Sequence, residues 1–368
     1  MFAKTEKQNL LGLSQDGLEQ LFDELGEKPF RARQLMQWIY QRGVVDFEEM
    51  TDLSKKLRTR LQKMAEVRLP TELSMHRSGD GTVKWLFSSG SGQAIETVFI
   101  PETSRGTLCI SSQVGCALDC AFCATGAQGF NRNLTAAEII GQVWYAMNAL
   151  PPRENGEPAV TNVVFMGMGE PLANYRNILP VIELLISDYS WGLSRRRVTV
   201  STSGIVPHMD KLGDDCNVSL AVSLHAPNDE LRNRLVPINK LHPIAELLEA
   251  CWRYAAKHSN RFITFEYVML KDVNDSIEHA DELAALLKGK PAKINLIPFN
   301  PFEGNEFTRS SAGTIRAFQD RLRGHDLVVT TRKTRGDDID AACGQLAGKV
   351  SDRVRVRLSE KNIRMATA

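Results

Sequence analysis

The sequence predicts an α/β fold in which six strand–helix units form an incomplete (β/α)6 barrel, preceded by a small helical domain and a β-hairpin. Short β-branched runs alternate with helix-length segments through the middle of the chain, which is typical of βαβ units and a parallel sheet. These units occupy roughly 230 residues, fewer than an eight-fold barrel requires. The first part of the chain has helical periodicity instead. We therefore expect one large barrel with a smaller appended domain.

The expected elements of the barrel follow from this alternation. Strand-like runs lie at 107–111, 160–166, 198–203, 218–224, 262–270, 293–299 and 327–331. Helical patterns lie at 135–150, 175–187, 244–258, 277–287 and 313–324.

The first hundred residues predict a separate unit. Helical periodicity occurs at 18–25, 32–42 and 53–64, with breaks around 28–30 and 41–43. Two strand-like runs at 82–87 and 93–100, joined by a Ser/Gly turn, predict a β-hairpin. We expect a helical accessory domain at 1–75, a hairpin and linker at 76–104, the barrel at 105–345 and a tail at 346–368.

Bulk composition is typical of a cytoplasmic enzyme. Of 368 residues, 43% are apolar, enough for a sizeable core. No run of eighteen or more apolar residues and no apolar N-terminal stretch occurs, so we expect neither a membrane span nor a secretory signal. Seven cysteines, an odd number, favour a reducing compartment. A net charge of +1 excludes a general polyanion binder, so any contact with nucleic acid must come from local patches.

Three closely spaced cysteines are the most informative motif. Cys116, Cys120 and Cys123 form a Cys-x-x-x-Cys-x-x-Cys triplet in which Phe122 precedes the third thiol. A structural zinc site needs four ligands, usually from repeated Cys-x-x-Cys pairs, whereas here only three closely spaced thiols occur and no His lies nearby. Three thiolates suit a 4Fe–4S cluster with one iron free of protein ligands. That iron can chelate the amine and carboxylate of S-adenosylmethionine (SAM). Buried or zinc-bound cysteines are the alternative.

Other polar residues follow the expected strands, where barrel chemistry occurs. Glycine at 169 lets the backbone approach a ligand closely, and Glu170 can meet an ammonium group. Side chains of Ser201, Ser223, His225 and Asn300 can hydrogen-bond ribose, a carboxylate or an adenine edge. The alternatives are helix N-caps for the two serines and a structural role for the histidine.

Glu96 lies in the second strand of the expected hairpin. Period-two alternation places it on the same face as Ala94, Val98 and Ile100. A carboxylate on an apolar face has a raised pKa or a partner. The alternative is a charge on an edge strand that faces solvent.

Together these motifs resemble the radical SAM methyltransferases of the RlmN/Cfr type, which methylate a ring carbon of adenine in RNA. The resemblance extends over nearly the full chain. It includes Glu96-Thr97-Val98, Gln113-Val114-Gly115-Cys116, Gly167-Met168-Gly169-Glu170-Pro171, Ser223-Leu224-His225, Asn295-Leu296-Ile297-Pro298-Phe299-Asn300 and Ala342-Cys343-Gly344-Gln345-Leu346. It implies a radical SAM barrel, a 4Fe–4S cluster on the cysteine triplet and two SAM molecules per turnover.

The resemblance also implies roles for individual residues. Cys343 would carry a methyl group, Cys109 would release the product by forming a disulfide with it, and Glu96 would accept a proton. SAM would be bound by Gly169, Glu170, Ser201, Ser223, Leu224, His225 and Asn300. Without the resemblance, Cys109 is typical of a small core residue, and Cys343 of either a core residue or an exposed thiol.

Partners follow from the same resemblance. It implies 23S rRNA and tRNA as substrates, an electron donor such as flavodoxin, and a monomer. Residues 28–63 include nine Lys or Arg and only four acidic residues, so the accessory domain can contact RNA phosphates. A solvated helix face is the alternative. Further candidate phosphate contacts are Arg195, Arg196, Arg197, Arg332, Lys333 and Arg335. The arginines Arg353, Arg355 and Arg357 in the tail suggest no clear role.

Three functions fit the sequence. The first is methylation of adenine carbon 2 in 23S rRNA and beside the anticodon of tRNA. The second is methylation of carbon 8 by an antibiotic-resistance relative, and the third is a zinc-stabilised RNA-binding module without redox chemistry.

Overall fold

A ten-stranded sheet organises most of the molecule. The computed structural model describes residues 7–257 and 262–348. Seven parallel strands follow one another in chain order: β6 (Gly106–Cys109), β9 (Asn162–Phe165), β10 (Val198–Thr202), β11 (Ser219–Ser223), β12 (Ile263–Met269), β13 (Ala292–Pro298) and β14 (Val328–Thr331). Antiparallel strands β5 (Ala94–Pro101), β4 (Val83–Ser88) and β3 (Thr71–Arg77) extend the sheet beyond β6.

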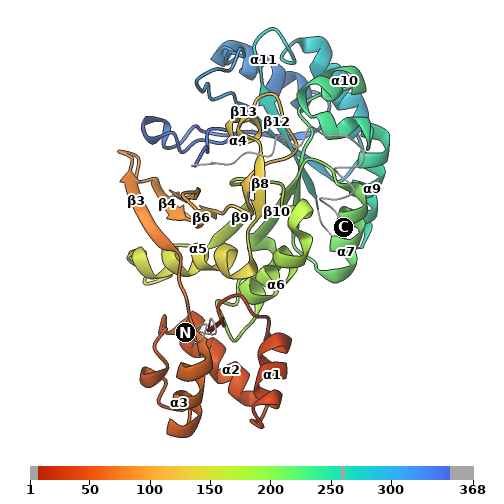
Figure 1. The fold of residues 1–368 in the computed structure, drawn as a ribbon. Helices are drawn as coiled ribbons and strands as arrows, with labels where there is room; N and C mark the ends of the chain where they lie inside the picture. Colours follow the sequence, from red (N-terminus) through yellow and green to blue (C-terminus); the bar gives the residue numbers. More distant parts are fainter. Residues whose placement is uncertain (1–6, 258–261, 349–368) are drawn as a thin grey trace.

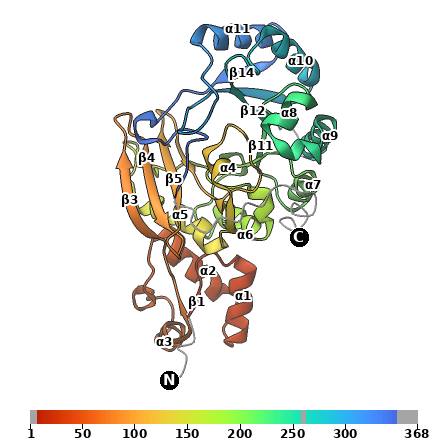
Figure 2. The same ribbon diagram turned by 45° about the horizontal axis from the view of Figure 1, so that its top comes forward.

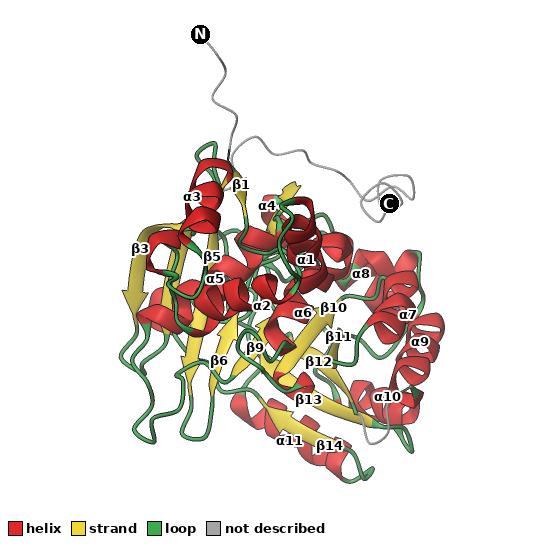
Figure 3. Cartoon of the chain, turned by 90° about the horizontal axis from the view of Figure 1, so that it is seen from below, coloured by secondary structure: helices red, strands yellow, loops and turns green. Residues whose placement is uncertain are grey.

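Helices connect the parallel strands and cover the outside of the curved sheet (Figure 3). The six connecting helices are α5 (Ala136–Ala149), α6 (Tyr175–Ile186), α7 (Val206–Asp215), α9 (Ile244–Ala256), α10 (Ile277–Leu287) and α11 (Ala312–Arg323). Short helices α4 (Ala124–Gln128) and α8 (Asp229–Leu235) lie in loops that follow strands, and a small ladder pairs β7 (Gln113–Gly115) with β8 (Phe130–Asn133).

The predicted barrel is confirmed. Each predicted strand and helix of the barrel is present within a few residues of its expected bounds. Six strand–helix units run from β6 to α11, and β14 adds a seventh parallel strand after them. Helices α4, α7 and α8 are additional to the predicted set.

The predicted hairpin is also confirmed, because β4 pairs with β5 in antiparallel register. Since β5 also pairs with β6, the hairpin continues the barrel sheet. Its third strand, β3, was not predicted, because nearly every side chain in β3 is exposed and no apolar alternation marks it.

The N-terminal helices form a small lobe against one end of the barrel (Figures 1 and 2). The lobe contains α1 (Gln15–Glu24), α2 (Phe30–Met36) continued by a π-helical turn (Gln37–Gln41), and α3 (Lys55–Met64), as predicted. Strand β1 (Gln8–Asn9) pairs with β2 (Ala65–Glu66), so both ends of the lobe meet.

Buried contacts fix the lobe to the barrel. The indole Nε1 of Trp144 in α5 donates to the Ile39 carbonyl over 2.7 Å, and the rings of Tyr40 and Trp191 pack edge to face at 5.1 Å.

The tail, with Arg353, Arg355 and Arg357, lies outside the described residues. None of the helices formed by residues 7–257 and 262–348 combines the length and apolarity that crossing a bilayer needs.

Candidate active site

A polar row lines the inner face of the barrel. Strand register pairs Ser223 with Glu266, Glu266 with Asn295, and Asn295 with Thr330. The Asn295 amide donates to Glu266 over 2.8 Å, and the Thr330 hydroxyl donates to Asn295 over 3.2 Å. Residues paired in register project from the same face of a sheet. The row therefore directs polar groups into the barrel.

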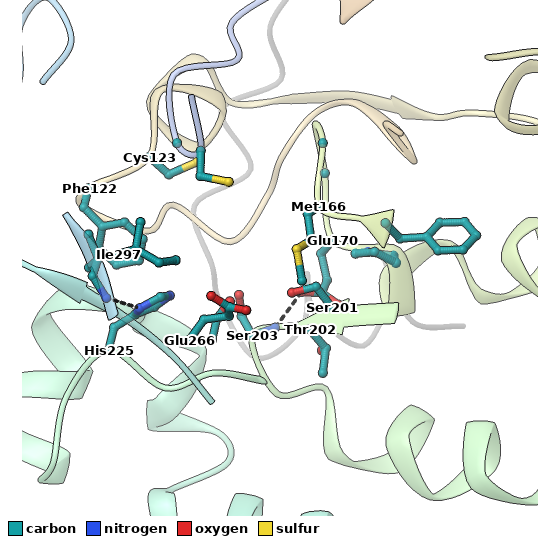
Figure 4. Close-up of a pocket in the computed structure, with 18 of the residues that line it drawn as sticks. Phe122, Cys123, Met166, Glu170, Ser201, Thr202, Ser203, His225, Glu266 and Ile297 are labelled. Carbon is teal, nitrogen blue, oxygen red and sulfur yellow. Dashed lines mark hydrogen bonds between the residues drawn. The ribbon is translucent and has the colours of Figure 1, made fainter. Parts of the chain in front are cut away.

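A cavity of about 160 Å³ opens at the carboxyl ends of these strands. Figure 4 shows Glu170, Ser201, His225 and Glu266 around this space, with Cys123 at its upper side. Of the sequence-predicted residues, Gly169, Glu170, Ser201, Ser223, His225, Cys123 and Cys343 line it. The structure therefore brings together side chains from β9, β10 and β11 with Cys123 and the segment of Cys343, whereas Cys116 and Cys120 do not line the cavity.

The cysteine triplet lies on the loop between β7 and α4. Its thiols are partly buried, and Cys120 Sγ lies 4.0 Å from the Ser203 hydroxyl. Burial, together with the neighbouring thiols, raises the pKa of Cys116 and raises that of Cys120 to about 12. In residues 7–257 and 262–348, no three His, Cys, Asp or Glu side chains converge on a point for a single metal ion. In a cubane cluster each thiolate binds a different iron, so the three sulfurs surround a larger volume.

Glu170 occupies the turn after β9. The preceding Gly169 has a φ of +96°, and a Cβ there would lie 2.5 Å from Cβ of Gln113, so only glycine fits. The Glu170 carboxylate accepts from the backbone N–H groups of Leu172 (3.1 Å) and Ser203 (2.8 Å). Burial raises the pKa of Glu170 to about 7 in spite of these hydrogen bonds. Its position links the ends of β9 and β10 beside the triplet.

His225 is fixed in one tautomer. Its Nδ1 accepts from the backbone N–H of Val268 over 3.0 Å, so the proton lies on Nε2. Burial, reinforced by the Arg232 cation, lowers the pKa of His225 to about 3, and the ring is neutral. Phe122 packs edge to face on this ring at 4.5 Å. The aromatic of the triplet thus ties the cysteine loop to the end of β11, and Nε2–H is left to donate.

Two predicted cofactor residues lie elsewhere. Leu224 is fully buried in the core and does not line the cavity. The Asn300 amide donates to the Cys343 carbonyl over 3.1 Å, and its oxygen accepts from Arg309 over 2.7 Å. In this structure Asn300 therefore supports the segment that carries Cys343.

The two separate cysteines lie close enough for the Cys343 thiol to influence the ionisation of Cys109. Cys109 is the last residue of β6 and is buried, whereas Cys343 lies in the segment after β14 and lines the cavity. Burial, then the Cys343 thiol, raises the pKa of Cys109 to about 12, and the Arg332 cation opposes this. The Cys343 thiol, Glu266 and Cys109 in turn raise the pKa of Arg332. All seven cysteines are free thiols in the structure.

Glu96 is buried on an inner strand and does not face solvent. Its carboxylate forms an ion pair with Lys84 at 3.2 Å and accepts from the backbone N–H of Ala347 over 2.9 Å. It does not line the cavity. The carboxylate therefore has the charged partner that burial on an apolar strand face requires, Lys84. Its second partner, Ala347, belongs to the segment of Cys343.

Comparison with known proteins agrees with this geometry. Residues 8–67 match the family described as ribosomal RNA large subunit methyltransferase N-terminal domain, and residues 110–286 match the radical SAM superfamily. The dual-specificity RNA methyltransferase RlmN of Marinobacter nauticus is 56% identical over 356 residues, covering 96% of each chain. This chain belongs to the RlmN family. A crystal structure of a radical SAM methyltransferase from Sphaerobacter thermophilus, 44% identical, matches with a TM-score of 0.85 and covers 92% of this chain and 99% of that one.

Membership of the RlmN family implies a 4Fe–4S cluster and SAM. The chain offers soft sulfur donors suited to iron on the triplet loop. Beside them, the cavity presents an acidic group, hydroxyls and the His225 donor, as a SAM zwitterion and its ribose require. The residues present therefore fit both groups.

Several cavity residues were not predicted as site residues. Glu266 lies in the middle of the apolar run of β12 and lines the cavity. A lone carboxylate in an apolar strand was the sequence feature that could have identified it as a site residue. Ser203 and Thr202 follow Ser201 at the end of β10. Arg332, a candidate phosphate contact, also lines the cavity.

Proposed function

We propose that this chain methylates carbon 2 of an adenine in 23S rRNA and of the adenine 3′ to the anticodon in tRNA. The observation that carries this proposal is the 56% identity with a dual-specificity RlmN over 96% of each chain. The cavity, the cysteine triplet and the electrostatic influence of Cys343 on Cys109 support it. A target base must leave its stack to reach the barrel mouth, so the substrate is folded RNA with an accessible loop.

SAM binding follows from the cavity lining. We propose that Gly169, Glu170, Ser201, Ser223 and His225, which line the cavity, hold SAM. The family resemblance also implies Leu224 and Asn300, which lie outside the lining and would act through the backbone that they support. Cys116, Cys120 and Cys123 would hold a 4Fe–4S cluster, and such a cluster would supply the electron that cleaves the carbon–sulfur bond of SAM. The buried Glu170 carboxylate is placed to meet the SAM ammonium, and neutral His225 is placed to donate through Nε2.

Cys343 is the proposed methyl carrier, and each turnover consumes two SAM molecules. Its sulfur takes a methyl group from the first, which leaves as S-adenosylhomocysteine. That methyl group then gives a hydrogen atom to the 5′-deoxyadenosyl radical from the second. The resulting methylene radical, still attached to Cys343, adds to carbon 2. The radical adduct would return one electron to the cluster held by the cysteine triplet and give its ring proton to a base, which leaves the RNA joined to Cys343 through a thioether.

Cys109 is the proposed resolving residue. Its thiolate attacks the Cys343 sulfur, the carbon–sulfur bond breaks, and the electron pair moves to the base, which takes up a proton to complete the methyl group. A Cys109–Cys343 disulfide forms, and a cellular dithiol must reduce it before the next turnover. Glu96, on the strand that pairs with β6, is the proposed acceptor of the ring proton.

The wider setting is proposed from the same family. We expect a monomer in the reducing cytoplasm, supplied with electrons by a flavodoxin-like protein. The helical lobe, with its excess of Lys and Arg, is proposed to hold RNA. Seven free cysteines fit that compartment.

The product isomer tests this function. Anaerobically reconstituted protein is supplied with SAM, a one-electron donor and rRNA or tRNA transcripts, and the nucleosides are then separated by mass spectrometry against standards. We expect 2-methyladenosine in both RNAs. A product of 8-methyladenosine would favour the antibiotic-resistance type, and zinc without iron in the protein would favour an RNA-binding module.

A further inference from the structure

The segment that carries Cys343 is held on several sides. This Cys343 segment, residues 332–348, runs from the end of β14 back across the barrel mouth to strands β4 and β5 (Figures 1 and 2). On the barrel side, the backbone N–H of Ala124 donates to the Gly344 carbonyl over 2.8 Å, and the Thr125 hydroxyl donates to the Leu346 carbonyl. These contacts join it to the helix that follows the cysteine triplet.

A second set of contacts joins the Cys343 segment to the antiparallel strands. The Ser78 hydroxyl donates to Asp338 over 2.6 Å, and the Gly336 N–H donates to Asp80 over 3.2 Å. Further along, Gly348 has a φ of +54°, and a Cβ there would lie 2.3 Å from the Ala94 carbonyl oxygen. The backbone therefore lies directly against β5, close enough to require glycine.

Between these contacts, one ion pair grips the backbone on both sides of Cys343. The Lys84 ammonium donates to the Asp340 carbonyl over 3.2 Å and pairs with Glu96 over 3.2 Å. Glu96 in turn accepts from the Ala347 N–H over 2.9 Å. The chain of contacts therefore runs from Asp340 through Lys84 and Glu96 to Ala347, with Cys343 between its ends.

The burial of this pair argues for a purpose beyond stability. The Lys84 and Glu96 side chains are 12% and 11% exposed. Removing two charges from water is costly, and an apolar pair of similar size is often as stabilising. An apolar pair, however, can neither donate to a carbonyl nor accept from an amide. Hydrogen bonds to the backbone of the Cys343 segment are therefore what this polar pair supplies and an apolar pair would not.

We propose that Lys84 is a positioning residue for Cys343, and that the Lys84–Glu96 pair clamps the Cys343 segment so that the sulfur faces the cavity. This inference depends on the proposed role of Cys343 as methyl carrier. The sulfur of Cys343 must successively meet a SAM methyl group, the adenine and Cys109, and small misplacements of reacting atoms are costly in rate. A clamp on both sides keeps these distances short while leaving the side chain free.

The test compares Lys84→Met with wild type as full-length, anaerobically reconstituted holoenzyme. Lys84→Arg serves as the conservative variant. Lys257→Met is the matched control, because Lys257 on the outer surface also bonds a carbonyl, that of Asp210, and a carboxylate, that of Asp214. Two quantities are measured: amide hydrogen exchange of peptides spanning 341–348, and kcat and KM for RNA methylation.

Lys84→Met is expected to raise exchange in these peptides by about tenfold or more, because the segment opens locally. The same change should lower kcat by about ten- to a hundredfold with KM for RNA nearly unchanged, because misplacement affects the reaction and not RNA binding. Lys84→Arg should recover most of kcat, and Lys257→Met should behave as wild type.

The clamp is rejected if exchange and kcat of Lys84→Met stay within about twofold of wild type, or if Lys257→Met produces the same changes. If Lys84→Met does not fold, the double variant Lys84→Met/Glu96→Gln replaces it, because this variant removes both charges while the Gln amide oxygen still accepts from Ala347. Amide exchange of its 341–348 peptides is then judged by the same tenfold and twofold criteria. If wild type forms no methyladenosine, the proposed function fails, whereas the exchange comparison still decides whether the clamp exists.

Discussion

His225 illustrates how a single side chain adapts to the barrel interior. The ring is enclosed at the end of β11, its Nδ1 accepts from Val268, and Phe122 of the triplet packs on its face. Its backbone φ of +60° is unusual for a non-glycine residue. Such a conformation persists only where the surroundings hold it, and it occurs here at the cavity wall.

His225 should make stability depend on pH. Its pKa is lowered to about 3 in the folded state, so between about pH 3 and 6.5 the unfolded chain binds a proton at this position that the folded chain does not. Stability should therefore fall as pH decreases below about 6.5, by about 1.4 kcal/mol per pH unit. In His225→Gln this contribution should be absent, giving a flatter profile in urea denaturation from pH 7 to 5. Parallel profiles for the two proteins would contradict the buried neutral histidine.

Cys109 provides a second prediction at this scale. Cys109→Ala should still form the thioether between Cys343 and RNA but should not release it, because no neighbouring thiolate can attack the Cys343 sulfur. Covalent protein–RNA adduct should accumulate on denaturing gels, and the 343-containing peptide should carry the modified nucleotide. Normal release of methylated RNA by this variant would remove the resolving role of Cys109.

At the level of elements, α5 shows how local sequence fixes a boundary. Thr135 caps the helix by accepting from the Glu138 N–H, and Glu138 accepts from the Thr135 N–H in return. Arg132 pairs with the same carboxylate at 2.7 Å. This reciprocal pattern is readable in the sequence, and the expected helix starts where the cap lies.

Removal of this cap should weaken the fold without changing the chemistry. Thr135→Ala should lower the free energy of unfolding by about 1 kcal/mol, because the Glu138 N–H loses its acceptor. Thr135→Ser keeps the hydroxyl and should stay near wild type. Chemical denaturation measures the difference, while kcat of both variants should match wild type. Equal stability of Thr135→Ala and wild type would show that the cap contributes nothing.

The elements that the sequence predicts are those with strong periodicity. Buried parallel strands such as β10 and β12 are mostly β-branched or apolar, interrupted by Ser201 and Glu266. Amphipathic helices such as α6 and α9 have clear apolar faces. Helix α8 is short and charged, and β3 is exposed on both faces, so neither produces a local pattern. Their formation depends on tertiary partners, and propensity alone does not predict it.

On the scale of the whole molecule, contacts distant in sequence complete the site. The positions of the triplet, Glu170 and His225 follow from one rule, that parallel strands end at the same edge. The hold of Lys84 on Asp340 spans 256 residues, and no local pattern predicts it. The same holds for Asn300, whose partner proved to be the Cys343 carbonyl.

The helical lobe carries the prediction for RNA. Lys55, Lys56 and Lys63 are exposed on α3. Replacing all three by Gln should weaken RNA binding and lower the slope of log K against log salt by about one unit per lost phosphate contact. Filter binding at several salt concentrations measures both. Methylation at saturating RNA should be unchanged, and an unaltered salt slope would show that this face does not meet phosphate.

The most direct test of the account follows one methyl group through the reaction. Reconstituted protein turns over with SAM whose methyl group is fully deuterated, and the mass of the methyladenosine product is measured by mass spectrometry. Transfer through Cys343 predicts that one deuterium moves to 5′-deoxyadenosine and that solvent hydrogen replaces it, so the product methyl retains two deuteriums. A product that retains all three would contradict the methylene step and with it the proposed role of Cys343.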